Sequence, residues 1–398
     1  MEQNTPHRRR PRYSGKYPKN FREKYKELDP EKYGDIAAHV TAKGSTPAGT
    51  HIPIMVSEIL DVLKIQPGES GMDATLGYGG HTLEFLKALD HSGHLWSTDI
   101  DPIESLKTEN RLRALGYDEG CWTVVRTNFK NVDQVAADAG GFDFLLADLG
   151  VSSMQIDDPS RGFSWKTEGP LDLRMDPEHG TSAAERLKEL EEDELEGLFA
   201  ENADEPKSSA LARAIRSAIR SGKAPETTTD LRNIVYTVYG LKEEAPGRWV
   251  PAKGGAAGTA AGKMSGKADA RTGGKAPGSA DARAAGKGPG VGNAEDPLAA
   301  AKKACARVFQ ALRIDVNREF EVLYEFLGKL PDAMKPGGRI AILTFHSGED
   351  RLVKKAFKAG YQAGLYAEIA DDVIRPSAEE CVRNPRARST KLRWAVRA

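Results

Sequence analysis

The sequence lacks the features of a membrane or secreted protein. Its 398 residues contain only three cysteines, Cys121, Cys305 and Cys381, which form neither a metal-ligand spacing nor a paired framework. No stretch approaches the ~20 apolar residues of a membrane helix. The basic N-terminus also lacks the apolar core of a secretory signal. These absences predict a reducing, cytoplasmic setting, with no membrane partner and no bound metal.

The chain also has almost no net charge, but its charges are unevenly distributed. The formal total is −1, although residues 1–26 carry nine Lys/Arg against two acids and residues 252–294 carry seven against two. These segments therefore contribute +7 and +5, which leaves −13 on the rest of the chain. Such basic segments can attract a polyphosphate. Charge runs are equally often only solvated tails, so both interpretations stay open.

Two segments have too few large apolar residues to build a core. Residues 1–50 alternate Arg and Lys with Pro, Ser, Asn and Tyr. Residues 252–294 contain 13 Ala and 12 Gly and no aromatic residue. Segments of this composition cannot bury enough apolar surface to offset their chain entropy. We therefore expect a basic disordered tail at 1–50 and a disordered Ala/Gly/Lys-rich insertion at 252–294.

The rest of the chain alternates strand-like and helix-like patterns. Strands are predicted at 93–98, 122–126, 142–147 and 339–345, and the run at 142–147 is almost continuously apolar, as in a buried parallel strand. One long amphipathic helix is predicted over 299–330. A last strand, 391–396, is expected to lie antiparallel at the sheet edge. The alternation predicts an α/β fold with a doubly wound, mostly parallel sheet.

A long excursion interrupts this alternation after residue 156. Ser182 and Glu185 form a predicted capping box for a helix through about residue 199, and further helices are predicted at 208–221 and 229–239. We therefore predict a sheet domain made of 51–156 and 299–398. An inserted helical domain, 157–298, is expected to recognise the substrate and to contain the segment 252–294.

The run Asp73–His81 is the strongest candidate for a ligand-binding site. Three of the four residues 77–80 are glycine, so the backbone can turn sharply and approach a ligand closely. A helix pattern follows, whose first N–H groups favour a polar or anionic ligand. Asp99 stands about 20 residues further on, where nucleotide-binding βα units place an acid on the ribose. The sequence therefore predicts a nucleotide-type ligand here.

Further polar and aromatic residues follow the other predicted strands. Phe129 comes after 122–126, and Asp148 and Gln155 come after 142–147. Ligands of doubly wound sheets bind outside the carboxyl ends of the strands. We therefore expect these residues to join Gly79, Gly80, His81 and Asp99 around one pocket.

Seven motifs in one order carry a resemblance to a known family. They are Asp73–His81, Asp148–Gln155, Arg161–Ser164, Gly169–Asp176, Phe309–Ile314, Phe345–Ser347 and Asn384–Ser389. Together they resemble the bacterial 16S rRNA (cytosine-N4)-methyltransferase family, methyltransferase H, over roughly residues 51–398. The resemblance implies a class I methyltransferase fold with an inserted helical domain. It also implies S-adenosylmethionine as cofactor and 16S rRNA of the small ribosomal subunit as partner.

The resemblance implies a role for each candidate residue. Gly79, Gly80 and His81 would contact the cofactor, Asp99 its ribose and Phe129 its adenine. Asp148 and Gln155 would face the methionine end and the substrate cleft, with Asp148 as the candidate catalytic residue for methylation of a decoding-centre cytidine. Five arginines are candidate contacts to RNA phosphates, or else members of ion pairs: Arg161, Arg174, Arg313, Arg386 and Arg388.

Departures from the family pattern leave alternatives open. Ile100 stands where the family usually has a basic residue, and Gly348 replaces a leucine after His346-Ser347. The fold could therefore act on another RNA or a protein, or serve as a non-catalytic ribosome-assembly factor. A nicotinamide-dependent oxidoreductase is a further alternative, but the glycines lack the full Gly-x-Gly-x-x-Gly spacing.

Overall fold

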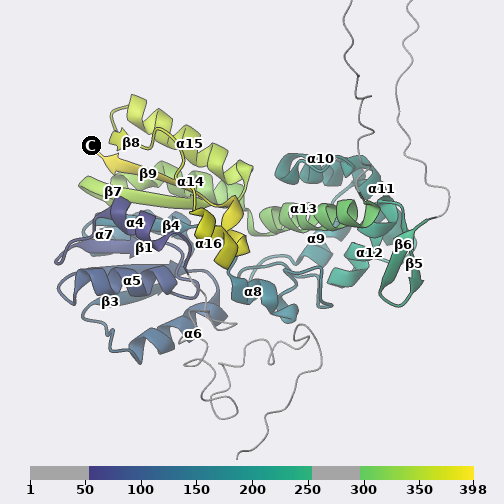
Figure 1. Ribbon diagram of the computed structural model, residues 1–398, viewed down its shortest axis with the longest axis horizontal. Coiled ribbons are helices and arrows are strands. Elements are labelled where there is room, and N and C mark those ends of the chain that lie inside the picture. The colour runs from purple at the N-terminus through teal and green to yellow at the C-terminus, as the bar shows by residue number, and fades with distance from the viewer. Residues whose placement is uncertain (1–52, 253–295) are drawn as a thin grey trace, which may run out of the picture.

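The computed structural model describes residues 53–252 and 296–398, which form a sheet domain and a helical domain joined by a long helix (Figure 1). The expected tail, 1–50, lies outside the described residues, as does all but the first residue of the expected insertion, 252–294. Among the described residues no helix is long and apolar enough to span a bilayer.

The sheet domain confirms the predicted α/β fold. Its seven strands lie in the order β3-β2-β1-β4-β7-β9-β8, of which β3, β2, β1, β4 and β7 are parallel. The strands are β1 (Ser70–Asp73), β2 (His94–Asp99), β3 (Trp122–Arg126), β4 (Phe142–Asp148), β7 (Met334–Thr344), β8 (Tyr366–Ile369) and β9 (Lys391–Arg397). Strand β9 is antiparallel to β7, as predicted, but it does not lie at the sheet edge. The short strand β8 pairs with its other side and forms the edge.

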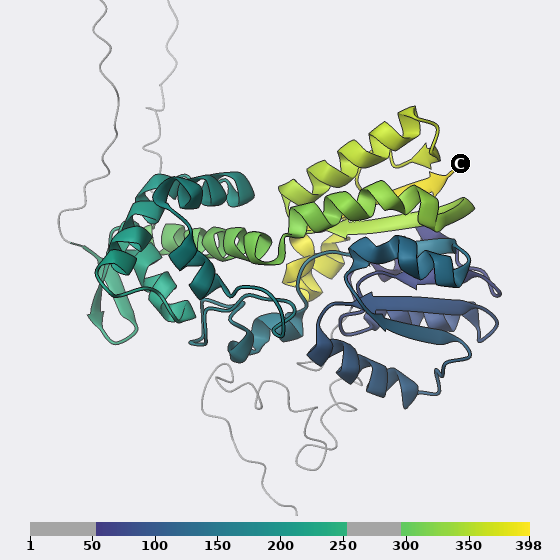
Figure 2. The ribbon, with the colours of Figure 1, turned by 180° about the vertical axis from the view of Figure 1, so that it is seen from behind.

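Helices cover both faces of this sheet (Figures 1 and 2). Strand β4 shows why, since Phe144 and Leu146 point to one face while Leu145 and Ala147 point to the other, and all four are buried. The first face packs on α4 (Val56–Leu63), α5 (Gly80–Leu89) and α6 (Pro102–Arg113). The second face packs on α7 (Val132–Ala139), α14 (Glu319–Ala333) and α15 (Ser347–Gln362).

The helical domain has its own apolar core. It contains α9 (Ala183–Glu189), α10 (Glu192–Ala203), α11 (Ser208–Arg220), α12 (Thr228–Val238), the hairpin β5 (Leu241–Ala245) and β6 (Arg248–Pro251), and α13 (Pro297–Asn317). The predicted Ser182–Glu185 capping box is present. The single helix predicted from it is two helices, because Leu190 leaves the helical conformation and α10 begins with a new capping box at Glu191.

The long helix predicted over 299–330 is also broken. Arg318 adopts a left-handed conformation with φ 50°, and it separates α13 from α14. Helix α13 buries Cys305, Val308 and Leu312 in the helical domain, whereas α14 packs on the sheet. One amphipathic pattern therefore serves two different cores, one on each side of Arg318.

Candidate functional site

The loop between β1 and α5, residues 74–79, is called the glycine loop here, and side chains of α6 hold it in place. Gly79 has φ 72°, and a Cβ there would lie 2.6 Å from the side chain of Thr108 on α6. Thr108 Oγ1 donates to the carbonyl of Gly77 at 2.6 Å. The guanidinium of Arg111 lies over the Tyr78 ring, 4.1 Å from its centroid. Glycine is required at residue 79 because both the conformation and the close approach exclude a side chain.

Asp99 ties this loop to the end of β2. Its two carboxylate oxygens accept hydrogen bonds from the backbone N–H groups of Gly77 at 2.7 Å and Asp101 at 2.8 Å. Burial raises the pKa of Asp99 to about 6, although these two hydrogen bonds act in the opposite direction. The carboxylate is therefore a fixed acceptor at the carboxyl edge of the sheet, as the sequence predicted.

Asp148 ends β4 directly beside the loop. Its backbone N–H donates to Thr75 Oγ1 at 2.7 Å, and its Oδ2 lies 3.5 Å from His81 Nδ1. Its Oδ1 is buried and has no hydrogen-bond partner in the described part of the chain. Burial raises the pKa of Asp148 to about 6, the nearby His81 opposes this, and the Asp73 carboxylate adds to it. A buried carboxylate oxygen without a donor is costly, so it is positioned for a donor that comes from a ligand.

His81 connects Asp148 to the start of the described chain. Its Nε2 lies 2.9 Å from the carbonyl oxygen of Ile54, so Nε2 carries a hydrogen. The opposite nitrogen, Nδ1, faces the Asp148 carboxylate. The imidazole therefore lies against the carboxylate and holds it in place. Both ring nitrogens are thus engaged by protein groups, whereas the resemblance implied an imidazole directed at the cofactor.

Phe129 and Gln155 lie on two other sides of the same cavity. Phe129 begins a short 3₁₀ turn after β3, and its ring packs edge-on against Phe326 with centroids 5.1 Å apart. Gln155 is buried in α8 (Ser153–Asp157) and donates to Asp101 Oδ2 at 2.7 Å. Its carbonyl oxygen accepts from Ser152 N in a capping box. Gln155 therefore braces the wall of the cavity through Asp101.

The cavity itself has a volume of about 700 Å³ and lies between the two domains. All the predicted cofactor residues line it, and they come from the glycine loop, the start of α5, the ends of β2 and β4, the turn after β3, and α8. The helical-domain side contributes Phe163, Trp165 and Phe309. A cavity of this size, with one apolar wall and a few fixed polar groups, is typical of a site for a nucleoside-like molecule and a second small group.

Arg161 does not have the position expected of an RNA contact. Its side chain is buried, and Nη1 donates to the fully buried Asp101 carboxylate at 2.7 Å. Nη2 donates to the carbonyls of Arg174 and Met175. Asp101 also caps α6 through the N–H groups of residues 103 and 104. Arg161 therefore ties the loop after β4 to the start of α6, and we leave it out of the proposed RNA contacts.

Replacing Arg161 by Ala is expected to lower the free energy of unfolding by about 3–5 kcal/mol, because it leaves the buried Asp101 carboxylate without its cation. Urea unfolding measures this change. The matched control is Arg388→Ala, which removes an exposed arginine and should change stability by no more than about 0.5 kcal/mol. Equal stability of the two variants would show that the Arg161–Asp101 ion pair does not stabilise the fold.

The other four arginines differ in availability. Arg174 pairs with Asp172 at 2.7 Å, and Arg313 pairs with Glu319 at 2.7 Å. Arg386 lies 3.6 Å from Asp157 but is 43% exposed, and Arg388 is exposed. Arg386 and Arg388 are therefore the candidates best placed to meet a phosphate.

The segment after β7 places His346 near this cavity. His346 caps α15, and its Nε2 lies 3.0 Å from the buried carboxylate of Glu349. Glu349 and Glu319 converge near His346 as potential metal ligands. Arg313, which pairs with Glu319, already supplies a positive charge there. The Arg313–Glu319 ion pair and the contact between His346 and Glu349 account for this cluster.

Gly348 departs from the family pattern because a neighbour occupies its space. A Cβ at residue 348 would lie 2.6 Å from the ring of Phe320 on α14. The same ring packs edge-on against His346, with centroids 5.8 Å apart. Phe320 therefore fills the volume that a leucine at residue 348 would need.

The variant Gly348→Leu is expected to lower the free energy of unfolding by about 1–3 kcal/mol, since it overpacks this contact. Adding Phe320→Ala should restore most of the loss, because the smaller side chain makes room for the leucine. Chemical denaturation of both single variants and the double variant tests the coupling. Additive effects would show that the two residues are independent.

Sequence reasoning missed Thr75 and Asp101, which orient Asp148, Gln155 and Arg161. Asp101 could have been predicted as a helix cap, because Asp followed by Pro is typical of a helix start. The sequence did not indicate that its second carboxylate oxygen binds the distant Arg161. Thr75 lies inside the glycine-rich run and gave no separate signal.

Comparison with known proteins places this geometry in context. The model of the MraW methylase family matches residues 48–254 and 292–398. The chain is 53% identical over its full length to the full-length ribosomal RNA small subunit methyltransferase H 1 of Agathobacter rectalis. It is 33% identical to ribosomal RNA small subunit methyltransferase H of Phocaeicola vulgatus, over 87% of this chain and 96% of that one. A solved putative rRNA-methylase from Clostridium thermocellum aligns over 87% of this chain and 100% of that one, with a TM-score of 0.38 at 10% identity.

Proposed function

The chain belongs to the MraW methylase family, and from that premise we propose that it uses S-adenosylmethionine to methylate the N4 amine of a cytidine in 16S rRNA of the small ribosomal subunit. The names of the relatives support the substrate class. The observation that carries the chemistry is the buried, unpartnered Oδ1 of Asp148 in the wall of the cavity. Action on ribosomal subunits would take place in the cytoplasm.

The residues around the cavity suit S-adenosylmethionine. Asp99 offers a fixed carboxylate to ribose hydroxyls, and Gly79 and Gly80 line the same cavity. Phe129 borders the cavity beside Asp99 and suits an adenine ring. When bound, the cofactor supplies an electrophilic methyl group.

Asp148 would act on the nucleophile. The lone pair of cytosine N4 is delocalised into the ring, so the amine is a poor nucleophile. A hydrogen bond from N4–H to Asp148 Oδ1 would favour a more pyramidal nitrogen and offset the positive charge that develops there. With a pKa of about 6, Asp148 is mostly carboxylate at neutral pH and can take the proton that the amine loses. His81 keeps the other oxygen in place during this step.

The target base must leave its stack to reach this cavity, because the Asp148 oxygen is buried. Trp165 lines the opposite wall and is half-buried, with its ring packed against Tyr236 at 6.5 Å. A base that enters between the domains could stack on Trp165 while its amine faces Asp148.

The proposal is tested by incubating the purified protein with labelled S-adenosylmethionine and either unmodified small ribosomal subunits or total tRNA. We expect label in 16S rRNA, recovered as N4-methylcytidine after digestion, and none in tRNA. Label in tRNA or protein alone would assign another substrate. Cofactor binding without label in any of these would indicate a non-catalytic assembly factor.

A further inference from the structure

Helix α15 carries opposite charges on its two sides. Its acids point inward, where Glu349 pairs with His346 and Asp350 pairs with Lys391 and Arg393 at 2.8 and 2.7 Å. Four cations point outward and are exposed: Arg351, Lys354, Lys355 and Lys358. Within residues 53–252 and 296–398, none of these four has an acidic partner in an ion pair. We call them the α15 basic stripe.

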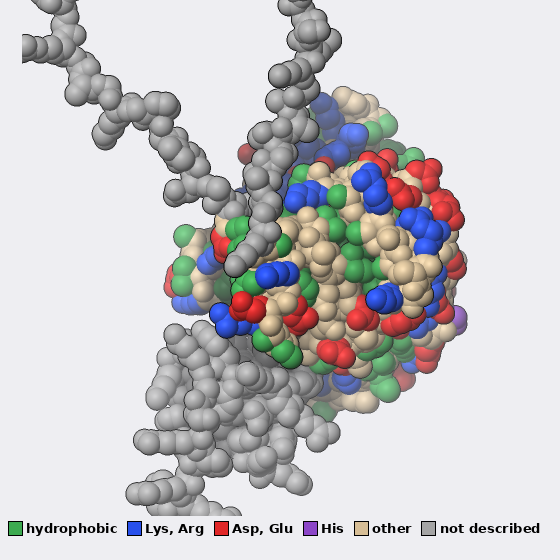
Figure 3. Space-filling view, turned by 90° about the vertical axis from the view of Figure 1, so that its right-hand side faces the viewer, with side chains coloured by type: hydrophobic (Ala, Val, Ile, Leu, Met, Phe, Trp, Pro, Cys, Tyr) green, Lys and Arg blue, Asp and Glu red, His purple; other side chains and the backbone are tan. Residues whose placement is uncertain are grey.

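This stripe contrasts with the exposed end of the helical domain. Figure 3 shows that end, where Lys and Arg side chains are interspersed with Asp and Glu side chains. The α15 basic stripe instead spans the eight residues 351–358, which corresponds to about 10 Å of helix. A stripe of this length can contact more than one phosphate, so it is better suited to a polyanionic strand than to a single small anion.

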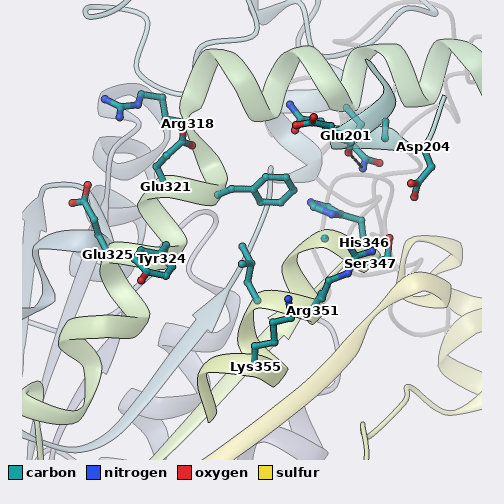
Figure 4. A pocket seen from close by; sticks show the side chains of 16 residues that line it. Glu201, Asp204, Arg318, Glu321, Tyr324, Glu325, His346, Ser347, Arg351 and Lys355 are labelled. Carbon is teal, nitrogen blue, oxygen red and sulfur yellow. Dashed lines mark hydrogen bonds between the residues drawn. The ribbon is translucent and has the colours of Figure 1, made fainter. Parts of the chain in front are cut away.

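The stripe borders a second cavity, of about 800 Å³, between the end of α10 and the starts of α14 and α15 (Figure 4). Arg351 and Lys355 lie on one side of it, and Glu201 and Asp204 lie across from them. Helix α14 contributes Phe320, Glu321, Tyr324 and Glu325 to the lining. Tyr324 is 74% exposed and lies beside the two acids of α14. An aromatic ring exposed to this extent, in the wall of a cavity that also holds Arg351 and Lys355, is typical of surfaces on which nucleobases stack.

The second cavity adjoins the cofactor cavity. Gln310, Arg318 and His346 line both of them. Arg318 is exposed and stands at the junction of α13 and α14, where the two domains meet. A polymer with one residue in the cofactor cavity could therefore place its neighbour in the second cavity.

We propose that the second cavity holds a nucleotide that flanks the target cytidine in the RNA strand. The α15 basic stripe contacts the phosphates, and Tyr324 stacks on the base. Glu201 and Asp204 accept hydrogen bonds from base amines or ribose hydroxyls, which is the use that acids have at an RNA surface. This inference rests on the proposed function and names a part of its substrate-binding surface.

The first test removes two charges, in Arg351→Ala/Lys355→Ala. The matched control is Lys64→Ala/Lys87→Ala, which removes two exposed charges near the ends of α4 and α5, at the opposite edge of the sheet. We expect the KM for small ribosomal subunits to rise about tenfold. We also expect the slope of log Kd against log salt for a single-stranded RNA oligonucleotide to fall by roughly 0.7 per lost phosphate contact. The kcat and the Kd for S-adenosylmethionine should stay unchanged, and the control should match the parent protein throughout.

The second test concerns stacking. Tyr324→Leu should weaken binding of the RNA oligonucleotide about tenfold, whereas Tyr324→Phe, which keeps the ring, should retain it. The matched control is Tyr361→Leu, which replaces another exposed tyrosine, on the last turn of α15.

The outcomes separate this inference from the proposed function. If the parent protein methylates subunits and the Arg351/Lys355 variant has the same KM, the flanking-nucleotide site is refuted and the proposed function stands. A raised KM for subunits with unchanged oligonucleotide binding would assign the stripe to a ribosomal protein and would also overturn the inference. If the parent protein methylates no rRNA, both fail.

Discussion

Asp148→Asn is expected to lower the single-turnover rate of methyl transfer about 10²- to 10³-fold, which is the size of effect seen when one preorganised charge-stabilising group is removed. The amide keeps the shape of the side chain but cannot take a proton from N4. Rapid-quench measurement of methyl transfer to small ribosomal subunits gives this rate directly. Asp143→Asn is the matched control, because Asp143 lies on the same strand but pairs with Lys335 at its other end.

The pH dependence gives an independent check on the same residue. Burial raises the pKa of Asp148 to about 6, so the transfer rate should rise with pH through 6 and level off above 7. Asp148→Asn should remove this rise. A rate that stays within a few-fold of the parent protein in Asp148→Asn, with the same pH profile, would mean that proton loss to water suffices and that Asp148 is not catalytic.

Asp148→Asn should stabilise the ligand-free protein at neutral pH, although it lowers the rate of methyl transfer. A carboxyl with a pKa raised by folding favours the native state most at low pH, and this contribution is lost as pH rises through about 6. At pH 7 the ligand-free protein therefore carries a destabilising buried charge. We expect Asp148→Asn to raise the free energy of unfolding by about 1–2 kcal/mol at pH 7 and by much less at pH 4.

Asp99→Ala is expected to weaken binding of S-adenosylmethionine about 10²-fold or more. Two effects combine, since the ribose loses a charged acceptor and Gly77 loses the hydrogen bond that holds the glycine loop. Isothermal titration calorimetry measures the change. Asp61→Ala on α4 removes an exposed acid and is the matched control. Affinity within threefold of the parent protein would place the ribose elsewhere in the cavity.

Much of this site could be predicted from the sequence because its residues lie at the ends of strands. Strands β3 and β4 are marked by β-branched or apolar runs, and the carboxyl ends of parallel strands share one edge. Asp99, Phe129 and Asp148 therefore meet for topological reasons. The glycines between β1 and α5 needed no tertiary information either, since their conformation is a local requirement.

The predictions failed where the structure of a residue or segment depends on a partner that is distant in the sequence. Arg161 has the composition of a surface arginine, and only the fold brings it to Asp101, 60 residues away. The continuous apolar pattern over 299–330 did not reveal that its two halves belong to different cores, because periodicity reports the buried face and not what covers it. The short edge strand β8 and the hairpin β5–β6 were missed for a related reason, since both are mostly exposed.

The proposed role of Asp148 is to direct methylation of cytidine N4 in 16S rRNA. Mass spectrometry of 16S rRNA from cells lacking this protein, complemented with either the parent gene or the Asp148→Asn variant, tests it most directly. We predict that N4-methylcytidine is absent without the protein, returns with the parent gene and does not return with the variant. Unchanged N4-methylcytidine in cells lacking the protein would contradict the proposed function, and full restoration by the variant would contradict the role of Asp148.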